Sequence, residues 1–178
     1  TKWVVKAQIH SGGRGKAGGI RLADSPEEAE ELATHVLGMR IKGLPVRKVL
    51  VDEAAEIQTE IYLAVTNDRA ARLPVLIASA AGGVEIEEVA RRDPGKLSRV
   101  WVDPFLGLRE YQARNLAASM ELPRQLWSEF AHIAGGLFKT FLGTDATLAE
   151  INPLVITKAS HLLALDGKIV LDDNALFR

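Results

Sequence analysis

A glycine-rich stretch near the start of the chain carries two cations. Residues 12–19 read Gly-Gly-Arg-Gly-Lys-Ala-Gly-Gly and directly follow an apolar, β-prone run from Trp3 to Ile9. Glycine leaves backbone N–H groups exposed, and such groups beside Arg14 and Lys16 suit the charge of a polyphosphate. We therefore expect a flexible loop that covers phosphates, with a glycine-rich surface turn as the alternative interpretation.

Two familiar phosphate-binding motifs do not fit this stretch. Residues 13–18 read G-x-G-x-x-G, the pattern of a dinucleotide-binding turn. In that turn the third glycine lies in a helix that has already begun, whereas here residues 19–22 continue as strand or loop and the first helix signal is Ser25. The pattern G-x-x-x-x-G-K-[ST] also fails, because His10 replaces its first glycine and Ala17 its hydroxyl residue.

Lys6 is a charged residue inside the opening apolar run. It lies between Val5 and Ala7, so the two-residue period of a strand places it on one face with Val4 and Gln8. One interpretation is a cation that points at a phosphate group. The other is a lysine whose stem is buried while its amine reaches water.

A second set of polar groups lies near the end of the chain. Residues 150–153 read Glu-Ile-Asn-Pro and residues 165–168 read Leu-Asp-Gly-Lys, on successive predicted strands. Pairing those strands places Asn152 and Asp166 near the same end, within reach of one ion. An amide oxygen and a carboxylate are hard ligands, suited to Mg²⁺ held mainly by phosphates and water. Ordinary turn chemistry is the alternative, because Asp-Gly and Asn-Pro are both common at turns and strand breaks.

The composition excludes several other kinds of site. The chain has no cysteine, which excludes disulfides, thiol catalysis and thiolate zinc sites. Its 22 Lys and Arg against 23 Asp and Glu give a net charge of −1, so no overall positive field predicts nucleic acid or an anionic membrane as a partner. No apolar run approaches the ~20 residues that span a bilayer. The four histidines show no metal-ligand spacing.

Two helices are expected to support these groups. Ser25 has the character of an N-cap, Pro26 that of a first helical residue, and Glu28 completes a capping box, so the first helix should run to near Gly38. The second opens at Leu122–Pro123 and carries a wide apolar and aromatic face as far as Gly143. That face must lie against a sheet.

The remaining elements are predicted strands. Three of them are rich in β-branched and aliphatic residues, and we interpret them as antiparallel neighbours in one sheet: 46–51, 59–65 and 73–79. Three shorter strands follow, joined by tight turns, one of which is Asp166-Gly167: 148–156, 161–165 and 168–171. Because strands and helices do not alternate as βαβαβ units, the fold class expected is α+β with two layers.

Five blocks of sequence stand in order along the chain. They are Trp-Val-Val-Lys-Ala-Gln at 3–8, Gly-Gly-Arg-Gly-Lys-Ala-Gly-Gly at 12–19, Gly-Gly-Val-Glu-Ile-Glu at 82–87, Glu-Ile-Asn-Pro-Leu-Val-Ile-Thr at 150–157 and Asp-Asn-Ala-Leu-Phe-Arg at 173–178. Together they resemble the β subunit of the succinyl-CoA synthetases. The resemblance covers essentially the whole chain, and five ordered blocks are far more specific than any one of them.

The resemblance implies an ATP-grasp fold, in which two α+β subdomains clasp ATP or GTP. The first subdomain is expected at about residues 1–66, with the glycine-rich loop and a hinge strand, and the remainder, with the metal-binding strands, at about 67–178. The family's first N-terminal segment and its C-terminal CoA-ligase domain are expected to be missing from this chain.

The resemblance also implies a nucleotide pocket. Lys6 would meet the phosphates, and Gly13, Arg14 and Gly15 would form the covering loop. The backbone of a hinge strand would meet the purine edge, with Glu60 nearby. The hinge residues are Asp52, Glu53 and Ala55, and this chain has Asp before Glu where many members have Glu first.

At the other end of the triphosphate, the resemblance implies a metal site and a catalytic carboxylate. Asn152 and Asp166 would hold Mg²⁺, and Glu150 would face the phosphohistidine loop of a partner. The cations on the opening strand and the metal would then hold one triphosphate from two directions during phosphoryl transfer.

The reaction implied is that of a ligase that forms succinyl-CoA reversibly from succinate, CoA and ATP or GTP. The phosphohistidine belongs to the α subunit, so an α partner is expected and this chain alone should not turn over succinate. Related ligases remain alternatives, namely a malate:CoA ligase or ATP-citrate lyase, as does a non-catalytic nucleotide-binding module. The location implied is the bacterial cytoplasm, with the mitochondrial matrix as the alternative because any leader would lie ahead of Thr1.

Overall fold

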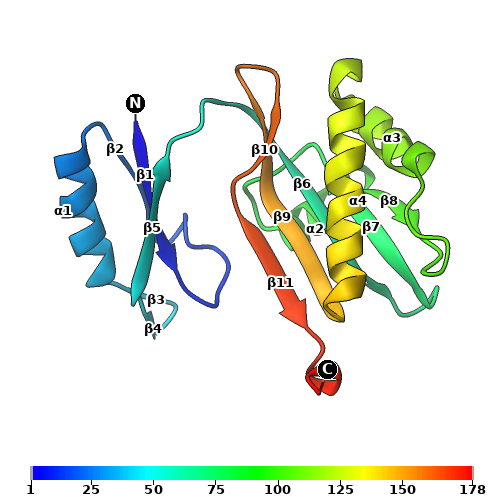
Figure 1. The fold of residues 1–178 in the computed structure, drawn as a ribbon, viewed down its shortest axis with the longest axis horizontal. Coiled ribbons are helices and arrows are strands. Elements are labelled where there is room, and N and C mark those ends of the chain that lie inside the picture. Colours follow the sequence, from blue (N-terminus) through cyan, green and yellow to red (C-terminus); the bar gives the residue numbers. More distant parts are fainter. Residues whose placement is uncertain (1, 178) are drawn as a thin grey trace. The chain divides into compact units, whose positions relative to one another are not determined.

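The computed structural model describes residues 2–177 and divides the chain into two compact units. The first unit ends at Glu56 and the second begins at Ile57. The first combines a β-sheet with one helix and the second a β-sheet with several, which confirms the expected α+β class (Figure 1). Within residues 2–177, no helix is long and apolar enough to cross a membrane.

The first unit is built on a three-stranded antiparallel sheet. Its central strand is β1 (Trp3–Gln8), flanked by β2 (Ile20–Ala23) and β5 (Lys48–Glu53). Helix α1 (Pro26–Leu37) packs on one face of this sheet (Figure 1). A short ribbon of β3 (Arg40–Ile41) and β4 (Leu44–Pro45) follows the helix.

Helix α1 begins where its local sequence predicts. The hydroxyl of Ser25 accepts a 3.1 Å hydrogen bond from the backbone N–H of Glu28, and Pro26 is the first helical residue. The Glu28 side chain accepts a 2.7 Å bond from the N–H of Asp24. The bond to Ser25 satisfies an N–H group that the first turn of a helix leaves without a partner. The predicted capping box is not completed, because Glu28 bonds to Asp24 and not to the N–H of Ser25. The helix ends at Leu37, before Gly38, as expected.

The second unit is built on a larger antiparallel sheet with the strand order β10-β9-β6-β7-β8. Strand β11 also pairs with β9, along a different part of that strand from β10. Its strands are β6 (Ile57–Asp68), β7 (Leu73–Ser79), β8 (Ser98–Trp101), β9 (Ala146–Thr157), β10 (Leu162–Ala164) and β11 (Gly167–Leu171). Short 3-10 turns lie at Pro94–Lys96, Arg124–Leu126 and Asp173–Ala175. Three helices complete the unit: α2 (Ile86–Arg92), α3 (Glu110–Ser119) and α4 (Trp127–Gly143).

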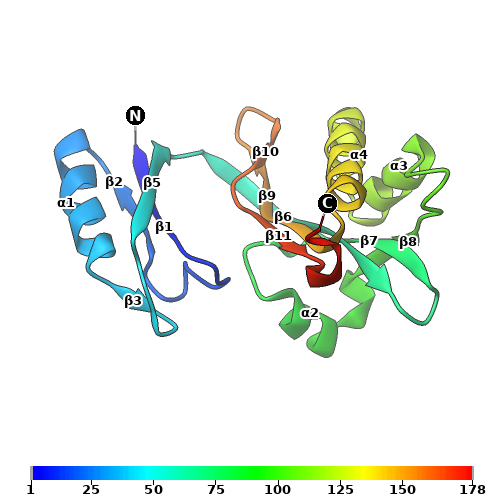
Figure 2. The ribbon, with the colours of Figure 1, turned by 60° about the horizontal axis from the view of Figure 1, so that its bottom comes forward.

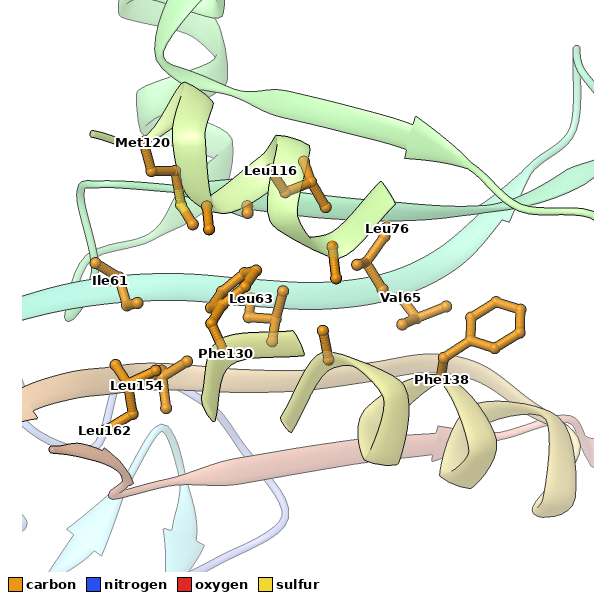
Figure 3. Close-up of a cluster of buried hydrophobic side chains, with 14 of the residues drawn as sticks. Ile61, Leu63, Val65, Leu76, Leu116, Met120, Phe130, Phe138, Leu154 and Leu162 are labelled. Carbon is orange, nitrogen blue, oxygen red and sulfur yellow. The ribbon is translucent and has the colours of Figure 1, made fainter. Parts of the chain in front are cut away.

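Helices α3 and α4 cover one face of the second sheet. Phe130 and Phe138 point from α4 towards Leu63 and Val65 of β6 (Figure 3). Full burial of such side chains stabilises the fold by about 1.5–3 kcal/mol each. The predicted aromatic face of this helix is confirmed, although a 3-10 turn precedes α4 and Gly143 is its last residue rather than a stop beyond it. In Figure 2, α2 lies on the side of the sheet away from α3 and α4.

The predicted single sheet of residues 46–51, 59–65 and 73–79 is wrong in its first member. β6 and β7 pair antiparallel as expected, but β5 pairs with β1 in the first unit, with Val51 opposite Val5. Residues 54–56 contain no tight-turn sequence, so they carry the chain onward from β5 instead of reversing it into a hairpin with β6.

The predicted hairpin turn at Asp166-Gly167 is also wrong. β10 and β11 do not pair with each other but lie end to end along the same edge of β9. The interruption between them lies opposite Pro153, whose nitrogen has no hydrogen to donate. Its carbonyl still accepts a 3.2 Å bond from the N–H of Leu165.

Candidate functional site

In the first unit, the face of the sheet away from α1 presents a cation among apolar side chains. Val5 and Ala7 belong to the core under α1, so strand alternation places Lys6 on the opposite face. Lys6 is only 8% exposed, and its Nζ lies 4.0 Å from Oδ2 of Asp52. Ile20 and Leu50 are its neighbours on the flanking strands and are partly exposed.

Strand alternation also separates the two acidic residues of the predicted hinge strand. Asp52 lies opposite Val4 and faces the same side as Lys6, whereas Glu53 lies opposite Trp3 on the side of α1. The backbone continues through Ala54, whose N–H donates a 2.9 Å bond to the carbonyl of Lys2, and Ala55 follows. Of this acidic pair, Asp52 is therefore the one near the predicted phosphate-binding lysine.

The glycine-rich loop joins β1 to β2 and is ordered by its own backbone. The N–H of Gly19 bonds to the carbonyl of Arg14 at 2.9 Å, and that of Gly18 bonds to Gly15 at 3.0 Å. Gly13 and Gly18 have φ of 78° and 76°, in the region that favours glycine. The Arg14 guanidinium donates a 2.7 Å bond to the carbonyl of Ala7. These bonds hold the loop against the end of β1, close to Lys6.

In the second unit, the predicted residues lie on β6, on β9 and in the connection between β10 and β11. Asn152 and Asp166 come together, because the N–H of Asn152 donates a 3.1 Å bond to the carbonyl of Asp166. The side chain of Asn152 also contacts the segment before α2, where its Oδ1 accepts a 2.9 Å bond from the N–H of Gly83. The carbonyl of Glu60 accepts a 3.0 Å bond from Gly82 in that same segment. The predicted proximity of Asn152 and Asp166 is confirmed, although not through a hairpin.

The donor set at Asn152 and Asp166 fits a magnesium ion bound together with phosphates. An amide oxygen has two lone pairs, so Oδ1 of Asn152 can accept from Gly83 and still bind a cation. Among residues 2–177, no three His, Cys, Asp or Glu side chains are grouped as a metal site. Two protein oxygens are few for a dedicated cage, but they suit Mg²⁺, which keeps several waters and binds largely through substrate phosphates.

The chain as a whole matches a known domain model. The family described as the ATP-grasp domain matches residues 1–156, most of the sequence. The chain belongs to the ATP-grasp family.

Relatives of this ATP-grasp chain carry ligase names. It is 55% identical over 177 residues to the Succinate–CoA ligase [ADP-forming] subunit beta of Roseiflexus sp.. It is 50% identical over 175 residues to the Succinate–CoA ligase [GDP-forming] subunit beta of Thermus thermophilus. Each alignment covers 98% of this chain and 46% of the relative, so the chain spans about half the length of the relatives it matches. These similarities confirm the resemblance carried by the five sequence blocks.

Solved structures with the same fold confirm the ATP-grasp architecture. ATP citrate lyase from Methanothrix soehngenii, solved with citrate and coenzyme A, matches with a TM-score of 0.74 at 23% identity, covering 99% of this chain and 40% of that one. A dinucleotide-forming acetyl-coenzyme A synthetase of Ca. Korarchaeum cryptofilum matches with a TM-score of 0.69 at 19% identity, covering 96% and 76%.

A tyrosine that sequence reasoning missed contacts Glu150, the predicted catalytic carboxylate. Glu150 lies on β9 opposite Ala64, and its Oε2 accepts a 3.1 Å hydrogen bond from the hydroxyl of Tyr62. Its Oε1 lies 3.7 Å from Nζ of Lys168 on β11. Burial, together with the nearby Glu150 carboxylate, raises the pKa of Tyr62 well above its usual range. The one signal in the sequence was the two-residue period of β6, which indicates the face of the strand on which Tyr62 lies. Identifying Glu150 as its neighbour requires the register between β6 and β9.

Proposed function

We propose that this chain is the nucleotide- and magnesium-binding part of the β subunit of an acid:CoA ligase. The reaction is the reversible formation of succinyl-CoA from succinate, CoA and ATP or GTP, through a phosphohistidine on a partner α subunit. The observation that carries the proposal is the 55% identity to a Succinate–CoA ligase β subunit over nearly the whole chain. A cytoplasmic location is proposed with it.

The first unit would bind the base and phosphates of the nucleotide. Lys6 supplies a positive charge from a strand whose open face also carries apolar neighbours suited to a purine ring. The loop from Gly13 to Gly15 would lie over the phosphates, with backbone N–H groups and Arg14 as donors. The backbone at Asp52, Glu53 and Ala55 would meet the purine edge.

The second unit would hold the metal and receive the partner's histidine. Asn152 and Asp166 would bind Mg²⁺, which when bound neutralises charge on the phosphates during transfer. Glu150 would face the phosphohistidine loop of the α subunit. Its carboxylate is kept in one orientation by Tyr62 on one oxygen and Lys168 near the other.

Calorimetry of Mg-ATP and Mg-GTP against the chain tests the binding half of this proposal. The wild-type chain should bind at least one nucleotide with a clear Mg²⁺ requirement, and Asp166→Ala should lose that requirement. Asp173→Ala, an exposed acidic residue of the terminal turn, is the matched control and should bind like the wild type. An Asp166→Ala variant with an undiminished Mg²⁺ requirement would show that the metal ligand has been misassigned.

Assay of the complete αβ enzyme tests the chemical half. Succinate, malate and citrate are offered separately with CoA and nucleotide, and turnover with succinate is the expected result. Preferential turnover of malate or citrate would replace succinate in the proposal. Nucleotide binding without phosphorylation of an added α subunit would point to a non-catalytic module instead.

A further inference from the structure

The side chain of Asn152 bonds in two directions to a single short segment. Its Oδ1 accepts a 2.9 Å hydrogen bond from the N–H of Gly83, and its Nδ2 donates a 3.0 Å bond to the carbonyl of Val84. Residues 82–84 lie immediately before α2, close to 70 positions away in the chain. One amide therefore joins β9 to a segment that is remote in sequence.

An amide supplies both the acceptor and the donor that this pair of bonds needs. A carboxylate, the more common protein ligand for Mg²⁺, has no hydrogen to offer the carbonyl of Val84 and would repel it. The same two bonds also decide which way the amide faces, because a flipped amide would set two donors and two acceptors against each other. The segment thus defines where Oδ1 of Asn152 points.

The segment packs closely against β6. The N–H of Gly82 bonds to the carbonyl of Glu60, and a Cβ at Gly82 would come within 2.5 Å of the carbonyl oxygen of Ile61. Gly83 has φ of 68°, and a Cβ there would collide with the carboxylate of Glu60. A side chain at Gly82 would therefore strike the backbone of β6, and one at Gly83 would be strained by its positive φ and would displace the Glu60 carboxylate.

We infer that Gly82, Gly83 and Val84 form a positioning element for the metal site, which fixes the Asn152 amide with its oxygen available to Mg²⁺. The inference rests on the proposed function, because it takes Asn152 and Asp166 as the metal ligands. Partners that orient a metal ligand typically alter metal affinity 10–100-fold when they are removed. By reciprocity, Mg-nucleotide binding at Asn152 must stabilise the contact with residues 82–84 by the same factor.

The variant that tests the inference is Gly83→Ala, with Gly107→Ala as the matched control. Gly107 lies in the same unit with φ of 69°, but a Cβ there would meet nothing within 4 Å. Both variants carry similar backbone strain, but only in Gly83→Ala would the new Cβ meet a neighbour, the Glu60 carboxylate, within the segment that bonds to Asn152. The Mg²⁺ concentration for half-maximal ATP binding should rise about tenfold or more in Gly83→Ala and stay at the wild-type value in Gly107→Ala. Equal Mg²⁺ requirements in the two variants would overturn the inference.

Hydrogen exchange of the wild-type chain gives a second measurement that needs no variant. Amides of residues 82–92 should gain protection with Mg-ATP, and gain less with ATP in the presence of a chelator. Unchanged exchange in this segment while Mg-ATP is bound would also overturn the inference, even if Gly83→Ala failed to fold. If the wild-type chain bound no Mg-nucleotide at all, the proposed function would fail first and this inference with it.

Discussion

The hydroxyl of Tyr62 on β6 donates a 3.1 Å hydrogen bond to Oε2 of Glu150 on the adjacent strand β9. Tyr62 is 4% exposed, and Glu150 is partly covered. Burial, the charge of Glu150 and, more weakly, the charge of Glu87 on α2 raise the pKa of Tyr62. The phenol is therefore a permanent donor to Glu150 at any physiological pH.

This pair predicts a loss of stability in alkali. Unfolded tyrosine loses its proton above about pH 10, whereas folded Tyr62 keeps it, so the unfolding free energy should fall by about 1.4 kcal/mol per pH unit in that range. Below the unfolded pKa this contribution is fully present. Tyr62→Phe should lack this slope and should lose about 1 kcal/mol at neutral pH with the hydrogen bond. Urea unfolding of both proteins across the alkaline range measures the difference, and parallel slopes would contradict the assignment.

At Asp68 we expect the opposite pH dependence of the unfolding free energy, with stability lost in acid. The indole N–H of Trp101 donates a 2.8 Å bond to its Oδ2, and this bond, followed by the backbone N–H groups of Ala71 and Ala70, lowers the pKa of Asp68. A lowered pKa stabilises the fold above the unfolded value of about 4, and the contribution is lost as pH falls through the folded pKa. Asp68→Asn should therefore show a shallower loss of stability between about pH 5 and pH 2. Identical acid unfolding curves would exclude this role.

Two phenylalanines in the second unit give a matched test of the core. Phe130 is fully buried between α4 and the sheet, whereas Phe105 is 97% exposed. Phe130→Ala should cost about 3–5 kcal/mol of unfolding free energy because it leaves a cavity. Phe105→Ala should change the unfolding free energy by less than about 0.5 kcal/mol. Equilibrium urea unfolding compares the two directly.

The charge of Lys6 is expected to matter for nucleotide binding more than for stability. Lys6→Met keeps an unbranched apolar stem and removes the amine near Asp52. Nucleotide affinity should fall at least about tenfold, the usual effect of losing a charge-assisted contact. Lys2→Met is the control, since Lys2 is an exposed lysine paired with Asp24 at 2.9 Å. Calorimetry should show near-wild-type affinity for that control, and equal losses in both variants would argue against a specific role for Lys6.

Gly19 should be intolerant of a side chain. A Cβ there would lie 2.5 Å from Cδ1 of Ile41, 3.1 Å from Cβ of Ala7 and 3.2 Å from the carbonyl oxygen of Arg14. Gly19→Ala should destabilise the first unit by about 1–3 kcal/mol, as overpacking usually does. Gly12→Ala, where a Cβ would meet nothing within 4 Å, should be neutral. Hydrogen exchange of β1 amides reports on this unit, and unaltered protection in Gly19→Ala would refute the packing argument.

Local features of the fold were readable from the sequence. The cap at Ser25, the strand before the glycine-rich loop and the aromatic face of α4 depend on residues within one or two turns of each other. The pairing of strands could not be predicted from local sequence. β5 has the same apolar character as β6, and nothing in its residues indicates that it pairs with β1 rather than with β6.

In the candidate site too, contacts between nearby segments could be predicted and contacts between distant ones could not. The proximity of Asn152 and Asp166 could be predicted because they lie on segments only 14 positions apart that run antiparallel. The contact of Asn152 with Gly83 could not be predicted, because 69 positions separate the two residues. Similarly, Asp52 and Glu53 were indistinguishable until the register with β1 showed which of them faces Lys6.

By itself the sequence determined where helix α1 and the glycine-rich loop begin, which charges are available, and the ATP-grasp family to which the chain belongs. Only the tertiary structure decided that Tyr62 lies against Glu150, 88 positions away, and that the amide of Asn152 is held by residues 83 and 84. The physical reason is that caps and periodicity are set by neighbours along the chain. Strand register is set by which apolar faces can be buried together, and that depends on every strand of the sheet at once.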